Sequence, residues 1–264
     1  MIMTTIEHED AKKPQGQGPL AEIEYWRERY GPFSTLFEQI GMPTVQKIIQ
    51  VLENEKGDTS MLPGFKDQYT ELNKHYVEAK DNVKFLSTLE RHFKNIAHGS
   101  FSSIQETLPS MMNALRMVWV ISRHYNSDER MVPLMERIAW QLCEKVTAGI
   151  GFPAVFKEPS TKALKKIEEG RNVLEKWKET YFATRDKIDT SGGHGRWDFD
   201  RKRLFEKTSY MSDRCNDIRE VVQVLEHFHN ILNNDLKSKH GWRTLGRGAF
   251  STSRGISHVV VLGI

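Results

Sequence analysis

The sequence contains few cysteines and no long apolar run, and these two absences exclude whole classes of protein. Its 264 residues include only two cysteines, Cys143 and Cys215, which lie far apart and form no CxxC pair. This pattern argues against a disulfide scaffold and a cysteine-bound zinc site, and it is typical of a reducing compartment. No stretch approaches the roughly 20 apolar residues of a membrane-spanning helix, so we expect no membrane partner.

The net charge is also small. The chain carries 38 Lys and Arg against 35 Asp and Glu, which leaves a formal charge of +3. The two signs are interspersed along the chain, whereas a protein that binds polyanions usually concentrates its basic residues on one surface. We therefore expect no nucleic-acid partner.

The motifs of nucleotide, metal and nucleophile sites are missing as well. No GxxxxGK[ST] pattern occurs, and GRGAFSTSRG at 246–255 lacks the lysine and the preceding strand of a phosphate-binding loop. His227 and His229 are two residues apart, which on a helix points them in different directions, whereas a metal pair needs a spacing of three or four. We predict no enzyme activity, no catalytic, cofactor or metal site, and no small-molecule substrate.

What the sequence does contain is helical periodicity. Between Leu20 and about Lys239, apolar residues recur at alternating spacings of three and four, which is typical of amphipathic helices. No segment shows the sustained two-residue alternation of a strand. The pattern predicts an all-α fold: an elongated array of long antiparallel helices, a helical-bundle stem, with disordered termini.

Stretches rich in glycine, proline and polar residues divide this helical pattern into parts. Residues 1–19 mix acids, lysines, Pro, Gln and Gly, and they predict a flexible N-terminal lead-in. The clearest break is AGIGFPAVFKEPS at 148–160, so we predict a first helical unit at 20–150 and a second at 160–240. Residues 241–264 are predicted to be a disordered C-terminal tail.

Three positions in the first unit predict local helix boundaries. Pro32 cannot donate a backbone hydrogen bond, so we expect a kink or two short helices there. Gly99 is expected to end a long helix in the left-handed conformation. The next helix is expected to begin at Ser103, which starts a capping-box pattern, or at Pro109, since proline favours the first helical turn.

The segment RWDFDRKRLFEKTSYM at 196–211 combines aromatic and charged side chains directly after a glycine-rich break. Such a mixture can bind single-stranded nucleic acid, but the interleaved acids would repel its backbone. In a structural interpretation the aromatics pack at the start of a helix and the arginines pair with acids on adjacent helices. Trp and Arg are also frequent in binding hot spots, so a partner surface stays open. The candidates are Arg196, Trp197, Phe199, Arg201 and Arg203.

Four long strings carry a resemblance to a known family. They are PLAEIEYWRERYGPFSTLFEQI at 19–40, DNVKFLSTLERHFKNI at 81–96, MMNALRMVWVISRHYNSDERMVPLMERIAWQL at 111–142, and RWDFDRKRLFEKTSYM at 196–211. In this order they resemble the first N-terminal tail region of dynein heavy chains, and their sequences are most similar to those of the axonemal members. The resemblance spans roughly residues 19–239.

The resemblance implies a segment of the stem of a ciliary or flagellar motor in the axoneme. In such heavy chains this region is helical and lies far from the ATP-hydrolysing ring. It assembles with dynein intermediate chains, light chains and neighbouring heavy chains, and it needs no cofactor. The aromatics that match the family pattern, which we interpret as core, are Trp26, Trp119, Trp197 and Phe199.

The sequence departs from the family pattern in two places. Gly31 and Pro32 replace what in the family looks like an uninterrupted helix, and residues 243–264 resemble unrelated sequence. The chain is therefore interpreted as a truncated fragment or a short isoform of a heavy chain. Two alternatives stay open: a free-standing helical module that competes for tail partners, and a helical enzyme, which would need a concave site with converging polar residues.

Overall fold

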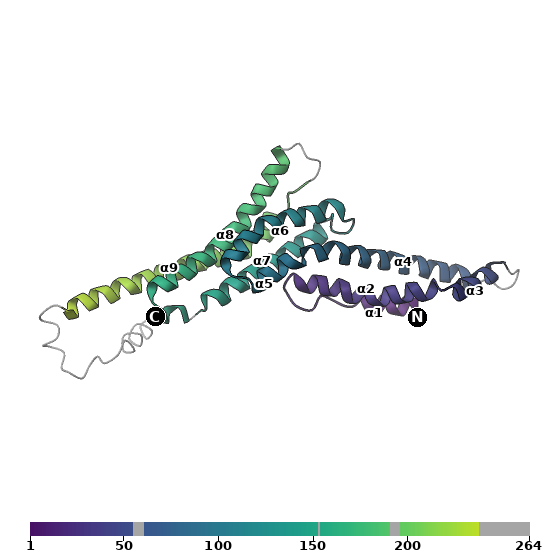
Figure 1. Cartoon of the computed structure of the whole chain (residues 1–264), viewed down its shortest axis with the longest axis horizontal. Coiled ribbons are helices and arrows are strands. Elements are labelled where there is room, and N and C mark those ends of the chain that lie inside the picture. Colours follow the sequence, from purple (N-terminus) through teal and green to yellow (C-terminus); the bar gives the residue numbers. More distant parts are fainter. Residues whose placement is uncertain (55–60, 153, 191–195, 238–264) are drawn as a thin grey trace, which may run out of the picture.

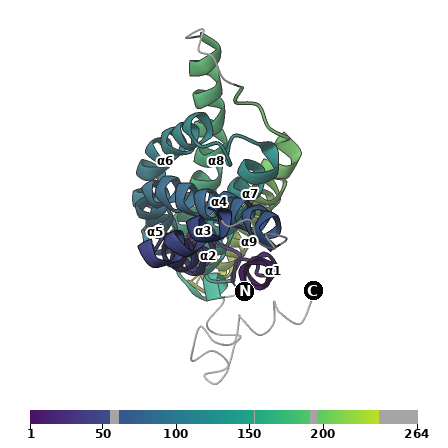
Figure 2. The same cartoon turned by 90° about the vertical axis from the view of Figure 1, so that its right-hand side faces the viewer.

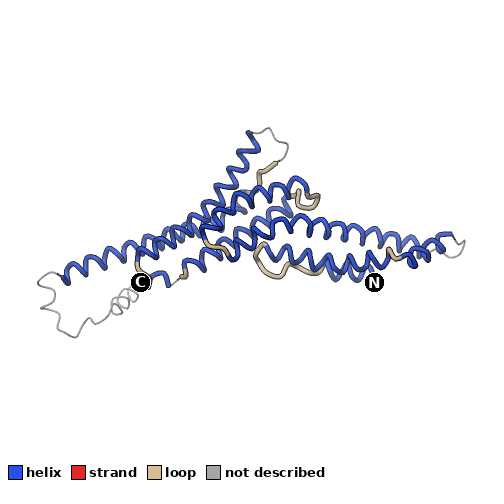
Figure 3. Tube along the Cα trace, viewed as in Figure 1, coloured by secondary structure: helices blue, strands red, loops and turns tan. Residues whose placement is uncertain are grey.

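The computed structural model describes residues 1–54, 61–152, 154–190 and 196–237, and all regular structure within these ranges is helical. The predicted all-α class is therefore confirmed (Figure 3). The elements are α1 (Ile2–Asp10), α2 (Leu20–Ile40), α3 (Pro43–Asn54), α4 (Met61–Leu86), the short 3₁₀ helix η1 (Ser87–Leu89), α5 (Glu90–His98), α6 (Phe101–Ile121), α7 (Asp128–Ile150), η2 (Ala154–Lys157), α8 (Ser160–Thr190) and α9 (Arg201–Lys237).

The helices form an elongated molecule (Figure 1). Helices α1 to α4 make an arm in which α2 lies along α4, while α5 to α9 form the central body. Helices α8 and α9 run antiparallel, and α9 leaves the body on the side opposite to the arm. The C-terminal end of α8 projects away from the body, as the view along the long axis also shows (Figure 2).

The buried side chains form one continuous core across the predicted break. The break itself is present, because α7 ends at Gly151, whose left-handed φ of 73° turns the chain away. Gly170 of α8 nevertheless lies directly against α7, since a Cβ there would be only 3.1 Å from Val146 Cγ1. The division into units at 20–150 and 160–240 therefore stays a prediction, and the predicted tail at 241–264 lies outside the described residues.

The N-terminus differs from the prediction of a flexible lead-in over residues 1–19. Residues 2–10 form α1, and the buried residues of this helix are Ile2, Ile6 and Glu9. Their spacing of four and three places them on one face, which packs against α2 and α4. The prediction was wrong for α1 because it was based on the polar composition and overlooked a short apolar face. A helix of this length is stable only through tertiary contacts.

Pro32 does not divide the first long helix, because α2 continues through it from Leu20 to Ile40. The missing N–H would have bonded the carbonyl group of Glu28, which is an exposed residue, so the unpaired carbonyl does not belong to a buried position of α2. The core contacts of Trp26 and Phe33 on either side hold the helix in place.

The boundary between α5 and α6 also differs from the prediction. Gly99 is extended, with φ −67° and ψ 167°, and is not left-handed. The cap of α6 is Ser100, whose hydroxyl oxygen accepts a hydrogen bond from the Ser103 backbone N–H at 3.3 Å. Helix α6 therefore starts before both predicted positions, and Pro109 lies inside it.

Candidate interaction surfaces

The four aromatic candidates Trp26, Trp119, Trp197 and Phe199 are all buried. Phe199 packs edge-to-face between two indoles, with ring centroids 4.8 Å from Trp119 and 5.1 Å from Trp197. The Phe199 backbone N–H also donates to the Tyr181 hydroxyl oxygen at 3.1 Å. These contacts join α6 and α8 to the segment that leads into α9, and such aromatic pairs add to the free energy of burial.

The three arginine candidates lie on the surface. Arg196 pairs with Asp128 at 2.8 Å, and Arg203 makes a bidentate pair with Glu136 at 2.9 Å. Arg201 lies over the ring of Phe182 at 5.7 Å. The partners of Arg196 and Arg203 both belong to α7, and because exposed ion pairs contribute little to stability, these pairs add little to the free energy of folding.

One surface cavity lies where α7 begins. It has a volume of about 460 Å³ and is open to solvent. Its lining consists of Trp119, Asn126, Ser127, Asp128, Glu129 and Arg196. The backbone N–H groups at a helix N-terminus attract anions, but here two carboxylates already occupy the first turn, and Asp128 pairs with Arg196. Hydrogen bonds from its own backbone N–H and from Ser127 lower the pKa of Glu129, so this cavity does not favour an anionic ligand.

Another surface cavity lies between α6 and the projecting end of α8. It has a volume of about 290 Å³. Its lining consists of Pro109, Asn113, Lys176, Glu179, Thr180, Ala183, Thr184 and Lys187. Side chains of both charges line this cavity, and the hydroxyls of Thr180 and Thr184 donate to backbone carbonyl oxygens of α8.

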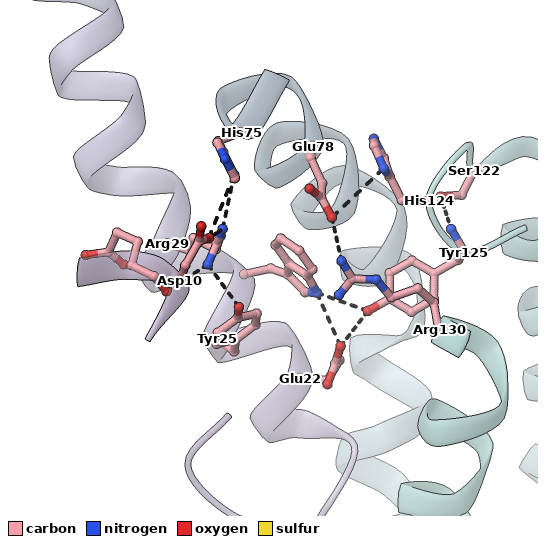
Figure 4. A network of polar contacts seen from close by, with 12 residues as sticks. Asp10, Glu22, Tyr25, Arg29, His75, Glu78, Ser122, His124, Tyr125 and Arg130 are labelled. Atoms are coloured by element: carbon pink, nitrogen blue, oxygen red, sulfur yellow. Dashed lines mark hydrogen bonds and ion pairs between the residues drawn. The ribbon is translucent and has the colours of Figure 1, made fainter. Parts of the chain in front are cut away.

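A buried hydrogen-bond network joins α2 to the turn between α6 and α7 (Figure 4). The Tyr125 hydroxyl donates to Glu22 Oε1 at 2.7 Å and accepts from Trp26 Nε1 at 3.0 Å. Arg137 Nε lies 3.4 Å from the other oxygen of Glu22. Burial and the neighbouring Glu22 carboxylate raise the pKa of Tyr125 well above its usual value, so this phenol is a fixed hydrogen-bond donor.

The network continues from Trp26 toward α4. The Arg130 guanidinium lies over the Trp26 ring at 5.2 Å and donates to Glu78 Oε1 at 2.7 Å. His124 lies 4.0 Å from the same carboxylate (Figure 4). Helices α2, α4 and α7 therefore meet at paired charges around one indole.

A second group of contacts holds α1 to the arm (Figure 4). Arg29 is buried, and its guanidinium donates to the Glu9 carbonyl oxygen at 2.7 Å and to the Tyr25 hydroxyl at 3.1 Å. It also pairs with Asp10 and lies 3.2 Å from His75 Nδ1. Sequence reasoning missed these residues, since only the three-residue and four-residue spacings along each helix were visible and not the partners across helices.

The described residues contain no arrangement suited to metal or thiol chemistry. In the ranges that the structure covers, no three His, Cys, Asp or Glu side chains are placed to hold a metal ion. Burial raises the pKa of both the Cys143 and the Cys215 thiol to about 11, so neither is a reactive thiolate near neutral pH. Among the described helices, none combines the length and apolarity needed to cross a bilayer.

Exposed apolar side chains instead gather on three helices. On α6, Met117, Val120 and Ile121 are 57, 52 and 51% exposed. A second group covers α3, and a third covers the C-terminal half of α9. The members of these two groups are Ile48, Val51 and Leu52 on α3 and Val221, Val224, Phe228 and Ile231 on α9. Single exposed apolar residues are ordinary, but groups on one helix face are typical of interaction surfaces.

Comparison with known proteins identifies the family of this chain. The sequence pattern of the family "Dynein heavy chain, N-terminal region 1" matches residues 2–247. The dynein axonemal heavy chain 10 of Homo sapiens is 52% identical over 241 residues, which is 91% of this chain. The dynein-1-alpha and dynein-1-beta heavy chains of the flagellar inner arm I1 complex of Chlamydomonas reinhardtii are 46 and 32% identical, over 91 and 80% of this chain.

The chain spans about 5% of the length of each of these relatives. The match nevertheless includes nearly every described residue, from α1 to the end of α9. The chain therefore belongs to the dynein heavy chain family, in which it corresponds to N-terminal region 1 and is similar to axonemal members.

Proposed function

We propose that this chain is a non-catalytic stem segment of an axonemal dynein heavy chain and acts in the axoneme of a cilium or flagellum. In this role it assembles with intermediate chains, light chains and neighbouring heavy chains of a microtubule-based motor. The names of the relatives, which are axonemal and flagellar heavy chains, support the location. The matched N-terminal region is distinct from the ATPase motor domain, which supports a structural role and a requirement for no cofactor.

The observation that carries the proposal is the apolar surface at the end of α6, which consists of Met117, Val120 and Ile121. The opposite face of α6 belongs to the core, so the surface is held on a rigid helix. Because little conformational entropy is lost when a rigid surface binds, such a patch is well suited to subunit contact.

The first test uses isolated axonemes and an antibody raised against residues 81–142. We expect a band of several hundred kilodaltons that remains on the axonemes and co-precipitates intermediate chains. A single soluble band near 30.6 kDa, free of dynein subunits, would refute the stem role. It would favour the alternative of a free-standing helical module.

The second test asks whether the α6 surface makes the contact. The tagged full chain is incubated with solubilised axonemal dynein subunits, and the retained subunits are measured by mass spectrometry. We expect Met117→Lys with Val120→Lys to lower retention at least about tenfold, because a charge cannot be buried in an apolar contact. The matched control is Ser110→Lys, since Ser110 is exposed on the same helix two turns away. Equal retention by both variants would exclude this surface.

A further inference from the structure

Helix α9 has two apolar faces, and the described structure covers only one of them. The inner face, with Cys215, Ile218 and Val222, packs against the core beside α7 and α8. The outer stripe, which we define as Val221, Val224, Phe228 and Ile231, is 44, 52, 57 and 42% exposed. Its spacing of three, four and three residues keeps the four side chains on one side of the helix, roughly 120° from the inner face at 100° per residue.

The stripe lies on the part of α9 that extends from the body. Arg219 still reaches Glu168 of α8 at 3.9 Å, but residues 227–231 are all exposed. Figure 1 shows this end of α9 reaching past the start of α8. A spacing of alternating three and four is that of a two-helix seam, so the stripe fits an amphipathic helix lying along α9.

A second copy of this chain does not fit the stripe well. One turn before Val221 the same side of α9 carries Arg214 and Asp217, which pair with each other at 3.0 Å. A parallel, in-register pair of α9 helices would place each Asp217 opposite its copy and each Arg214 opposite its copy. The apolar seam of such a pair would span only residues 221–231, about one and a half heptads, and the like charges at its end would oppose the pairing.

The position of α9 in the chain indicates a different occupant. It is the last described helix, and the family match continues past its end, to residue 247. The relatives are about twenty times longer than the matched segment, which is 5% of their length. In a full-length heavy chain, the tail helix that follows α9 would start beside the stripe, and this closeness gives a high effective concentration for antiparallel packing.

We propose that the outer stripe of α9 is the docking surface for the next helix of a full-length heavy-chain tail. The four residues of the stripe are all apolar, and Glu226, the charged residue between Val221 and Ile231, lies on the opposite side of the helix at 100° per residue. The occupant therefore presents an uncharged apolar face of about three turns, roughly 15 Å long. It runs antiparallel to α9. This inference rests on the proposed function, because it requires the region to be continued by more tail.

The test adds a polypeptide in trans to the full chain. The polypeptide covers the roughly 40 residues that follow the matched segment in the Homo sapiens relative, enough for a helix of about 60 Å. Single thiols are introduced by Val224→Cys on the stripe and by Asn230→Cys, an exposed position on the other side of α9. The native Cys143 and Cys215 are buried, so they react slowly with a maleimide.

We expect saturating polypeptide to slow labelling at position 224 at least about tenfold and at position 230 less than about twofold. Phe228→Lys should weaken binding of the polypeptide at least about tenfold in calorimetry, while Asn230→Lys should leave it unchanged. Absence of binding, or equal slowing at both positions, would overturn the proposal. Slow labelling at position 224 in a dimer without polypeptide would overturn it in favour of a second copy.

The outcomes for the stripe and for the proposed function can be separated. Phe228→Lys should still retain axonemal dynein subunits, because the α6 surface is unchanged. If subunits are retained but the polypeptide gives no protection, only the α9 inference fails. If the polypeptide binds but no subunit is retained, the stem fold is supported while the proposed assembly role fails.

Discussion

The substitution Tyr125→Phe tests whether the buried network joins α2 to α7. It removes one hydroxyl that donates to the Glu22 carboxylate at 2.7 Å and accepts from the Trp26 N–H at 3.0 Å. The Trp26 N–H keeps a longer bond of 3.3 Å to Glu22. Since a hydrogen bond to a charged group contributes about 1.5–3 kcal/mol, we expect the free energy of unfolding to fall by about 2 kcal/mol.

Urea unfolding followed by far-UV circular dichroism measures this loss. The matched control is Tyr210→Phe, because Tyr210 is exposed on α9 and should change the free energy of unfolding by less than about 0.5 kcal/mol. If both substitutions gave the same small change, the network would contribute nothing to the position of α2. The reasoning about buried pairing would then be refuted.

The same residue predicts a loss of stability in alkali. Burial raises the pKa of Tyr125 above its unfolded value of about 10, so the folded state holds the proton more tightly than the unfolded chain. The stability that protonated Tyr125 contributes is fully present below about pH 10 and is lost as the pH rises toward the pKa of Tyr125 in the folded state. Unfolding midpoints at about pH 8 and 10.5 should therefore differ less in Tyr125→Phe than in the original chain.

Three further predictions follow from burial, capping and charge. Trp197→Ala or Trp119→Ala should each lower the free energy of unfolding by about 3–5 kcal/mol in urea, whereas a loss below about 1 kcal/mol would place that indole on a binding surface. Ser100→Ala should cost about 1 kcal/mol in the same assay, since its hydroxyl caps α6, and an unchanged midpoint would contradict that role. Hydrogen bonds from Arg27, and then from Lys94, lower the pKa of Glu90 to about 2. The stability from this pairing is present above about pH 4.3 and is lost as the pH falls toward 2. Between those pH values the free energy of unfolding should therefore fall less in Glu90→Gln than in the original chain.

Much of the fold could be predicted from local pattern. Apolar residues at spacings of three and four predicted the helices, because a helix repeats every 3.6 residues whatever its partner is. The break at 148–160 was visible, since glycine tolerates the left-handed conformation that Gly151 adopts. The aromatic residues of the family pattern were interpreted as core, and all four are buried.

Local sequence patterns did not predict the cap of α6 or the helix within the N-terminal residues. Ser100 and Ser103 are both acceptable caps by residue type, and the choice depended on where α5 ended. Helix α1 is short and polar, and it is held by Arg29, which comes from another helix. Short helices are marginal alone, so their presence is a tertiary property.

The sequence by itself determined helix type and which side of a helix is apolar, because these depend on neighbours within one or two turns. Only the tertiary structure decided that Tyr125 meets Glu22, which is 103 residues away. It also decided that the stripe from Val221 to Ile231 is exposed among the described residues while the adjacent face of α9 is buried. Apolar faces that are buried within a chain and those that bind another helix have the same spacing, and only packing distinguishes them.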